Sequence, residues 1–348
     1  MNWSQNRSSI LLIYTGGTIG MKEDPRDLTL KPFDFSQILE SVPELRKFAM
    51  KIDSYTFTPL IDSSDVKPSM WRELAEIIRD RYDRYDGFVV LHGTDTMAYS
   101  ASALSFMLDN LSKPVIFTGS QLPVGRPRTD GKENLISAVE IAASKEDDGS
   151  ATVPEVAIFF NSVLIRGNRA TKVSATSFDA FASPNFPPLA EAGISIRFNR
   201  GLIHRPANGG APFGIHTDLD TRVSILKLHP GITEQVVRDI LLGSQTRAVI
   251  IETYGSGNAT SEPWFVDIVR EADRRGKVMV NVTQCLSGEV DMDIYATGRT
   301  LKDAGVLSGY DATTESVLGK LFYLLGKSDD NEKVKQLMAK NLKGEISK

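Results

Sequence analysis

The chain has 348 residues, of which 41% are hydrophobic and 24% are charged, and its formal net charge at pH 7 is −4. This composition is typical of a folded globular protein, and the length exceeds what one hydrophobic core usually supports, so we expect two domains. The absence of a long basic stripe argues against nucleic acid as the main partner. No apolar run is long enough to predict a membrane span.

The cysteine and histidine content excludes two further kinds of structure. A single cysteine, Cys285, cannot form an intrachain disulfide, and this fits a reducing compartment, so we expect a cytoplasmic protein. The four histidines show no HxH or HExxH spacing, so we expect no metal site and no cofactor. The first apolar run is also too short for a secretory signal.

Short apolar runs alternate with amphipathic segments over the first half of the chain. The runs predict strands at Ile10–Tyr14, Tyr55–Ile61, Gly87–Leu91, Val115–Thr118 and Val156–Phe160. The segments predict helices at Asp34–Phe48, Pro68–Tyr82, Thr96–Leu111 and Gly131–Ser144. This alternation predicts an α/β fold with right-handed crossovers and a doubly wound, mostly parallel sheet.

The pattern breaks in a stretch rich in proline and glycine, and it then resumes on a smaller scale. We expect an N-terminal α/β domain at 1–190 that carries the catalytic threonines, a linker at 191–221, and a smaller C-terminal α/β domain at 222–348. The smaller domain is predicted to hold strands at Val223–Leu228, Ala248–Ile251 and Val278–Val282, and helices at Thr233–Gly243, Glu262–Arg275 and Thr314–Leu325. The charged tail Lys327–Lys348 predicts a surface helix with frayed ends.

Polar residues follow each predicted strand of the first half. In open α/β sheets, ligands bind outside the carboxyl ends of the strands, so we expect these residues to lie on one edge. They are Thr15 to Gly20, Asp62 to Asp65, His92 to Thr96, Gly119 to Gln121, and Arg166 to Lys172. Hydroxyl groups, one carboxylate and one lysine would therefore converge there.

The turn TGGTIG after the first strand lacks both GxxxxGK[ST] and GxGxxG, so it does not predict a phosphate loop. Two glycines permit a tight bend and a close approach of substrate. The β-branch of Thr18 limits its χ1 angle and so fixes the direction of its hydroxyl, as a nucleophile requires. The alternative is an ordinary turn after a strand, in which Thr18 serves only as a structural cap.

A threonine hydroxyl is a weak nucleophile and needs a base or a polarising neighbour. Thr94 and Asp95, in HGTDTM, offer a second hydroxyl and a carboxylate, but this pattern is also typical of a helix N-cap. Lys172 is a candidate proton acceptor if it is desolvated, and otherwise a solvated charge. The turn Asp62 to Ser64 is suited to hold a small zwitterion, or is simply a solvated turn.

Six segments together resemble the L-asparaginase family in its cytoplasmic bacterial form. They are IYTGGTIGM, LIDSSD, LHGTDTMAYSASALSFML, GNRATKVSA, TYGSGN and TQCLSG. The resemblance runs over nearly the whole chain, from about Ser9 to Leu325, and the pair TGGTI and HGTDT is highly specific. It implies a hydrolase that converts L-asparagine to L-aspartate and ammonia.

The resemblance also implies catalytic roles. Thr18 would be the nucleophile that attacks the side-chain amide and forms an acyl-enzyme. Thr94, Asp95 and Lys172 would form the second triad of the family, in which Lys172 tunes the proton affinity of Thr94. The backbone N–H of Thr94 would contribute to the oxyanion hole.

Further residues are implied to bind the substrate. Ser63 would hold its α-carboxylate, with Asp62 and Ser64 beside it, and Asp95 would bind its α-amino group. Asn258 would reach the site of a neighbouring subunit, which implies a homodimer or a homotetramer.

The sequence departs from the family pattern at the lid and at a second, allosteric asparagine pocket that some relatives carry. The segment after the first motif has no tyrosine where family members often have one, and Leu28 falls near its place. Thr283 and Cys285 resemble part of the allosteric pocket, but Glu252 stands where those relatives have an arginine for the effector carboxylate. We therefore expect weak or absent activation by asparagine. Glu289 is not assigned the role of a partner-subunit glutamate found in some secreted members.

Alternatives remain open at this point. The chain could be a dual glutaminase–asparaginase, a tRNA-dependent amidotransferase subunit, or a lysophospholipase. The last two are expected to carry an additional amino-terminal domain or carboxyl-terminal repeats. From another class, a non-catalytic amino-acid sensor could use the same fold, although the complete set of Thr18, Thr94, Asp95 and Lys172 argues against it.

Overall fold

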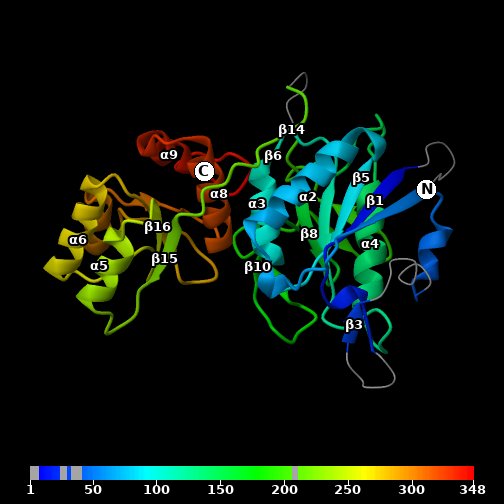
Figure 1. The fold of residues 1–348 in the computed structure, drawn as a ribbon, viewed down its shortest axis with the longest axis horizontal. Helices are drawn as coiled ribbons and strands as arrows, with labels where there is room; N and C mark the ends of the chain where they lie inside the picture. The colour runs from blue at the N-terminus through cyan, green and yellow to red at the C-terminus, as the bar shows by residue number, and fades with distance from the viewer. Residues whose placement is uncertain (1–7, 24–29, 33–40, 206–210) are drawn as a thin grey trace. The chain divides into compact units, whose positions relative to one another are not determined.

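The computed structural model describes residues 8–23, 30–32, 41–205 and 211–348. The chain forms two compact units (Figure 1). The first unit consists of Met1–Ser183 and Pro187–His216, and the second consists of Pro184–Phe186 and Thr217–Lys348. Leu28 and the first part of the predicted helix Asp34–Phe48, residues 34–40, lie outside the described residues.

The first unit is built on an eight-stranded sheet with the order β13-β12-β9-β8-β7-β5-β1-β4. Its strands are β1 (Ser9–Tyr14), β4 (Lys51–Thr56), β5 (Gly87–Leu91), β7 (Val115–Thr118), β8 (Val156–Phe160), β9 (Val163–Arg166), β12 (Ala190–Ala192) and β13 (Ile196–Phe198). The five strands from β4 to β8 in this order run parallel, and β9, β12 and β13 alternate in direction. The central strands β5, β7 and β8 are fully buried, as a sheet covered on both faces requires.

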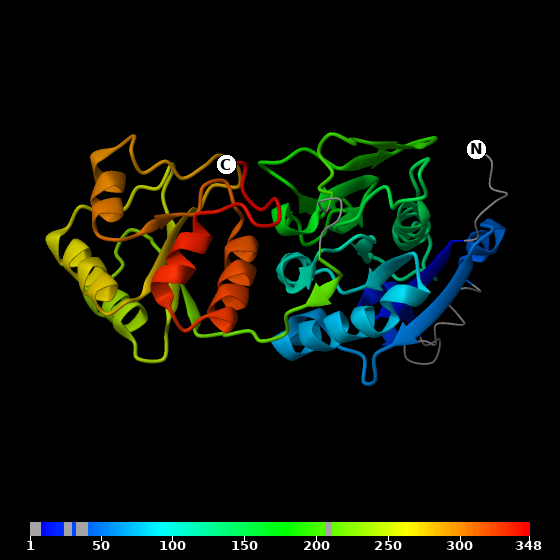
Figure 2. The same ribbon diagram turned by 90° about the horizontal axis from the view of Figure 1, so that it is seen from above.

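Helices cover both faces of this sheet; they are α2 (Pro68–Arg81), α3 (Met97–Met107) and α4 (Gly131–Ala143). Tyr82, which follows α2, stacks on Phe88 of β5 with ring centroids 6.1 Å apart. A Cβ added at the neighbouring Gly87 would instead meet the carbonyl oxygen of Ala142 in α4 at 2.5 Å. Because successive strand residues point to opposite faces, α2 and α4 lie on opposite sides of the sheet (Figure 2).

The two crossovers that follow β5 differ in hand. α3 connects β5 to β7, and α4 connects β7 to β8, so the chain moves in one direction across the sheet. α3 packs beside α2, where Trp71 Nε1 donates to Ser100 Oγ at 2.8 Å, and so lies on the face opposite α4. Two such connections over opposite faces have opposite hands. The expectation of right-handed crossovers throughout is therefore wrong for one of them.

Short pairs complete the first unit: β2 (Met21–Glu23) with β3 (Leu30–Pro32), β6 (Leu108–Asp109) with β14 (Gly214–Ile215), and β10 (Thr171–Lys172) with β11 (Phe181–Ala182). The stretch 191–221, predicted as a linker, contributes β13 and β14 to this unit. Edge strands of two or three residues leave little periodicity to detect among prolines and glycines.

Two predicted elements of the first unit have different bounds. The second strand is Lys51–Thr56 instead of Tyr55–Ile61. It lies at the edge of the sheet, where lysine and aspartate side chains reach solvent, so its polar start does not stand out as a strand. In the described part of the predicted helix Asp34–Phe48, Pro43–Lys47 forms a 3₁₀ helix. Pro43 supplies no backbone N–H to continue an α-helix.

The second unit is a smaller α/β layer structure with a parallel sheet in the order β15-β16-β17-β18. Its elements are β15 (Val223–Lys227), α5 (Glu234–Leu242), β16 (Ala248–Thr253), α6 (Pro263–Arg274), β17 (Val278–Thr283), α7 (Ala296–Asp303), β18 (Leu307–Ser308), α8 (Thr314–Lys327) and α9 (Asn331–Met338). Apolar residues of α5, α6 and α7 form one core cluster with the sheet, and α8 and α9 also pack on its strands. The predicted fold class is thus confirmed for both units.

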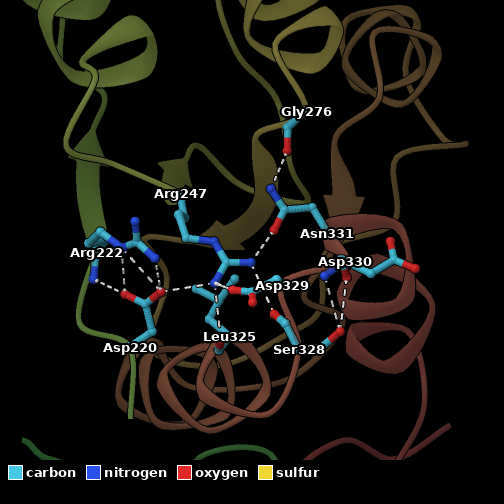
Figure 3. A network of polar contacts seen from close by, with 9 residues as sticks. All are labelled: Asp220, Arg222, Arg247, Gly276, Leu325, Ser328, Asp329, Asp330 and Asn331. Carbon is cyan, nitrogen blue, oxygen red and sulfur yellow. Dashed lines mark hydrogen bonds and ion pairs between the residues drawn. The ribbon is translucent and has the colours of Figure 1, made fainter.

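Arg247, immediately before β16, contacts several segments of the second unit (Figure 3). Its Nη1 donates to Asp220 Oδ2 at 2.9 Å and to the carbonyl of Leu325 at 3.0 Å. Its Nη2 donates to the carbonyl of Ser328 at 3.0 Å and to Asn331 Oδ1 at 2.6 Å. The guanidinium thus satisfies carbonyls at the end of α8, where a helix leaves acceptors without intrahelical partners.

The carboxyl-terminal tail differs from the prediction of a helix with frayed ends. After α9 the chain turns back, and Glu345 and Ile346 are 1% and 3% exposed. Glu345 Oε1 pairs with Lys320 Nζ of α8 at 2.6 Å, and both side chains are almost completely buried. Lys320 Nζ also donates to the carbonyl of Met338 at 3.0 Å. A buried ion pair therefore holds the tail, and sequence periodicity gives no signal for such a contact.

Candidate functional site

The turn after β1 is shaped by its two glycines and by Tyr14 beneath it. Gly17 has φ 92° and ψ 169°, a backbone region that is essentially restricted to glycine, and it caps a 3₁₀ helix at Thr18–Gly20. Tyr14 Oη donates to the carbonyl of Gly17 at 3.4 Å, and burial raises the pKa of this phenol well above its usual range. Tyr14 is therefore a permanent donor that braces the turn from which Thr18 projects.

The turns that carry the two threonines are packed directly against each other. A Cβ added at Gly17 would meet both Cα and N of Gly93 at 2.5 Å. Thr18 follows the first of these glycines and Thr94 follows the second. Glycine at both positions thus permits the backbones to approach closely enough for one reaction site.

The turn after β4 joins the same group. A Cβ at Gly93 would meet Ser63 Oγ at 2.5 Å. Ser63 Oγ donates to Asp95 Oδ2 at 3.4 Å and accepts from the backbone N–H of Asp95 at 3.3 Å. Thr96 Oγ1 donates to the carbonyl of Ser63 at 2.6 Å. These bonds connect the predicted substrate-binding serine to the predicted triad.

Thr94, Asp95 and Lys172 are in direct contact. Lys172 Nζ lies 2.9 Å from Thr94 Oγ1 and 2.7 Å from Asp95 Oδ1. The lysine side chain is 19% exposed, whereas that of Asp95 is 61% exposed. A mostly buried lysine side chain therefore places its Nζ between a hydroxyl and a carboxylate that faces solvent.

The alternative in which Thr94 or Asp95 caps a helix is wrong. The N-cap of α3 is Thr96, and its side chain makes no capping hydrogen bond. The Thr94 hydroxyl and the Asp95 carboxylate are instead directed to Lys172. Lys172 is likewise no solvated loop charge, because both contacts hold its ammonium in place.

Lys172 reaches this position by a longer path than predicted. The segment that carries it follows β9, which runs antiparallel to β8, so Arg166 lies beside Ala157 near the start of that strand. The 3₁₀ helix Gly167–Arg169 then passes along α3, where Ser102 Oγ donates to the carbonyl of Gly167 at 3.3 Å. The assumption that Lys172 directly follows the carboxyl end of a parallel strand is wrong, but the predicted convergence on Thr94 is correct.

The buried side chain of His92 supports the turn that carries Thr94. Its Nδ1 is 2.7 Å from the carbonyl of Gly93, its Nε2 is 2.9 Å from Ser100 Oγ, and Ser100 Oγ in turn accepts from Trp71 Nε1. Complete burial lowers the pKa of His92 to about 4, outweighing the opposite effect of its bond to Gly93. A neutral imidazole that donates from Nδ1 and accepts at Nε2 satisfies this chain of bonds.

Asp62 is held in its ionised form at the edge of the site. Its Oδ1 accepts from the backbone N–H and from the hydroxyl of Ser64, at 2.9 and 2.8 Å. These two bonds, the backbone bond first, lower the pKa of Asp62. The turn therefore offers a carboxylate, which can bind an ammonium group, beside the buried hydroxyl of Ser63, which can donate a hydrogen bond to a carboxylate.

Gln121 belongs to this group. The sequence pattern places it on this edge but predicts no role for it. Its Oε1 lies 3.5 Å from Thr94 Oγ1, and its Nε2 donates to the carbonyl of Ser177 at 2.9 Å. The signal that points to it is its position three residues after the end of β7, on the edge where the other polar residues lie.

The remaining predicted residues lie in the second unit. Asn258 Oδ1 accepts from Thr297 Oγ1 at 2.9 Å. Thr283 Oγ1 donates to the carbonyl of Gly255 at 2.6 Å and accepts from the backbone N–H of Cys285 at 3.0 Å.

Glu252 is already engaged by neighbouring side chains. Its Oε1 accepts from Thr314 Oγ1 at 2.8 Å, and its Oε2 is 3.5 Å from Lys227 Nζ. The carboxylate is therefore oriented within its own unit.

Within the part of the chain that the structure describes, no group of three or more His, Cys, Asp or Glu side chains is arranged to hold a metal ion. None of the helices in the described ranges is long and apolar enough to cross a membrane.

Comparison with known proteins connects this geometry to one family. Residues 9–204 match the family model described as Asparaginase, N-terminal, and residues 222–338 match the Glutaminase/Asparaginase C-terminal domain. The chain is 46% identical to L-asparaginase 1 of Escherichia coli (strain K12) over 343 residues, which cover 98% of each protein. It is 41% identical to the 60 kDa lysophospholipase of Mus musculus over 97% of this chain and 62% of that protein.

A solved structure gives the same result. L-asparaginase I from Vibrio cholerae superposes with a TM-score of 0.88 at 42% identity, over 98% of this chain and 100% of the other. The chain belongs to the asparaginase family, as the sequence motifs predict.

Proposed function

We propose that this protein is an L-asparaginase, which hydrolyses the side-chain amide of L-asparagine to L-aspartate and ammonia. The observation that carries the proposal is the contact of Lys172 Nζ with Thr94 and Asp95, next to the turn of Thr18, in a chain of the asparaginase family. The relatives named L-asparaginase cover almost the whole chain, which supports the same activity here.

In the proposed reaction, the Thr18 hydroxyl attacks the amide carbon of asparagine. The C–N bond then breaks, and the nitrogen leaves as ammonia with the proton from the hydroxyl. Water hydrolyses the resulting ester, which releases aspartate and restores Thr18. Proton movement requires an acceptor near the nucleophile, and Lys172 in its neutral amine form, in contact with the Thr94 hydroxyl, is proposed to supply one.

The substrate's charged groups are assigned to the turns beside the two threonines. Ser63 offers a hydroxyl to the α-carboxylate, while Asp62 and Asp95 offer carboxylates to the α-ammonium group, and Ser64 orients Asp62. The Thr94 backbone N–H is assigned to the oxyanion that forms at the amide carbon.

Asn258 is proposed to complete the site of a neighbouring copy, in a homodimer or homotetramer. Its amide is oriented by Thr297, which supports a positioned rather than a mobile side chain. The single cysteine supports a cytoplasmic location.

The second asparagine pocket is proposed to be inactive. Glu252 presents a carboxylate where an effector carboxylate would bind, and like charges repel, whereas an arginine would bind it bidentately. The contacts of Glu252 with Thr314 and Lys227 support a structural role for this side chain. Thr283 and Cys285 would then serve the turn at Gly255.

The proposal is tested by ammonia release from asparagine, from glutamine and in buffer alone. We expect turnover of asparagine and a much lower kcat/KM for glutamine, because an extra methylene displaces the amide from a nucleophile whose position matters to about 1 Å. Comparable values for the two amino acids would indicate a dual glutaminase–asparaginase. Binding without turnover would indicate a sensor.

Two substitutions test the residue assignments. Thr18→Ala should lower kcat by several orders of magnitude while the protein stays folded. Lys172→Met should remove activity across the pH range yet leave asparagine binding measurable, whereas Lys333→Met, at an exposed position of α9, serves as the control. A Thr18→Ala variant with near-wild-type kcat would refute the nucleophile.

A further inference from the structure

Gln121 lies between the Thr94 hydroxyl and the segment that follows Lys172. Its side-chain amide approaches Thr94 Oγ1 with its oxygen, at 3.5 Å, and Ser177 with its nitrogen, at 2.9 Å. Its backbone N–H donates to both carboxylate oxygens of Asp130, at 3.1 and 2.9 Å. Both ends of this residue are thus fixed.

The orientation of the amide follows from the chemistry of its neighbours. Ser177 presents a carbonyl oxygen, which only accepts, so the NH₂ group of Gln121 must face it. The carbonyl of the amide is then directed to Thr94. A reversed amide would place two acceptors 2.9 Å apart and would direct its NH₂ group to Thr94.

The Thr94 hydroxyl proton is directed by its two neighbours. When Lys172 is an ammonium it can only donate, so Thr94 Oγ1 accepts from it at 2.9 Å. The hydroxyl proton must then point elsewhere, and Gln121 Oε1 is an acceptor within 3.5 Å. This separation is long for an O–H···O bond, so the contact is a weak hydrogen bond whose main effect is to direct the hydroxyl proton toward Gln121. Hydrogen bonds at reaction sites often shorten once substrate is bound.

Gln121 also restrains the backbone beyond Lys172. Ser174 Oγ accepts from the backbone N–H groups of Thr176 and Ser177, at 3.2 and 2.9 Å, which makes a compact turn. Gln121 bonds to Ser177 in this turn, and the same side chain also contacts Thr94. One side chain thereby restrains both members of the Thr94–Lys172 pair.

We propose that Gln121 is a positioning residue for the proposed hydrolysis, which orients the Thr94 hydroxyl and holds the Lys172-bearing segment against it. This inference rests on the proposed function. Gln121 acts through Thr94 and Lys172 and does not itself take part in bond making or breaking.

The first test is Gln121→Met, which keeps the approximate volume but removes both polar groups. We expect kcat for asparagine to fall about 10- to 100-fold with KM changed less than about threefold, because misplacement by about 1 Å costs roughly 100-fold. The matched control is Gln235→Met on the exposed side of α5, where the amide donates to Asp239 at 2.8 Å. This control should retain wild-type kcat.

The second test separates positioning from a merely structural role. Gln121→Glu keeps an acceptor for Thr94, but it adds a carboxylate near Lys172. Thr94 Oγ1 is 3.5 Å from the side-chain oxygen at position 121 and 2.9 Å from Lys172 Nζ, so the carboxylate can lie no farther from Nζ than the sum of these two distances. An opposite charge favours the charged form of lysine. The pH–rate profile of Gln121→Glu should therefore shift to higher pH, and its activity should recover toward alkaline pH. A structural defect would lower the rate equally at every pH.

The outcomes of the two proposals are distinguishable. If the wild type releases no ammonia from asparagine, the proposed function fails. If the wild type is active but kcat of Gln121→Met stays within twofold of it and the Gln121→Glu profile is unshifted, only the role of Gln121 is overturned. Loss of kcat in Gln121→Met together with the shifted profile supports it.

Discussion

Because Gly17 packs closely on Gly93, we predict that adding a single methyl group at Gly17 moves Thr18 and Thr94 apart. In Gly17→Ala, the new Cβ would lie 2.5 Å from two backbone atoms of Gly93. Non-bonded atoms settle at roughly 3.5 Å, so the two turns must move apart by about 1 Å. Backbone atoms cannot rotate away as a flexible side chain does.

The expected effect has two parts. The backbone at Gly17, with φ 92° and ψ 169°, costs a residue other than glycine about 1–3 kcal/mol, so the free energy of unfolding should fall by that amount. The displacement of Thr18 relative to Thr94 should lower kcat/KM for asparagine by roughly 100-fold. The loss of activity should thus remain under conditions in which the variant is fully folded.

Ammonia release and thermal unfolding measure these two parts separately. Gly149→Ala is the matched control, because Gly149 also has positive φ, +83°, but a Cβ there meets nothing within 4 Å. It should lose stability and keep its activity. If Gly17→Ala retains kcat/KM within threefold of the wild type, the reasoning from turn separation is refuted.

Three other predictions follow from the structure. The buried neutral His92, with its pKa lowered from 6.5 to about 4, contributes stability that is present above pH 6.5 and is lost as the pH falls toward 4. The wild type should therefore lose about 3 kcal/mol of unfolding free energy over this range relative to His92→Gln, as measured by urea denaturation. Plots of unfolding free energy against pH that run parallel for the two proteins would contradict this. Lys320→Met leaves Glu345 buried without its ionic partner and should lower the free energy of unfolding by roughly 3–5 kcal/mol. Lys335→Met, in which the acidic partners are more exposed, should lower it by under about 1 kcal/mol. Equal denaturation midpoints for the two variants would show that the tail contact is unimportant. Asparagine rate curves should be nearly hyperbolic with a Hill coefficient of about 1, and a sigmoidal curve that Thr283 or Cys285 substitutions flatten would show a working second pocket.

Long apolar runs were the most predictable part of the fold. β5, β7 and β8 have the predicted bounds, because each is buried on both faces and so is apolar throughout. The edge strand β4 was misplaced because half of its surface is open to solvent and tolerates Lys51 and Asp53. The hand of the crossovers was also misjudged, since it depends on which face each helix covers.

For the candidate site, the sequence supplied the residue types and their approximate meeting place. The glycine turn and the HGTDT segment end adjacent parallel strands, so local pattern and strand direction suffice to bring Thr18 and Thr94 near each other. The approach of Lys172 was predicted for an incorrect reason, because an antiparallel strand and a return segment intervene.

The sequence by itself determined the α/β alternation, the glycine turns and the hydroxyl, carboxylate and lysine groups available for chemistry, because these depend on local periodicity and residue type. Only the tertiary structure decided that Gly17 and Gly93 are in contact, that Gln121 faces Thr94, and that Glu345 is buried against Lys320. These contacts join residues distant in the chain, and they depend on the packing of side chains and turns in three dimensions, which no short stretch of sequence encodes.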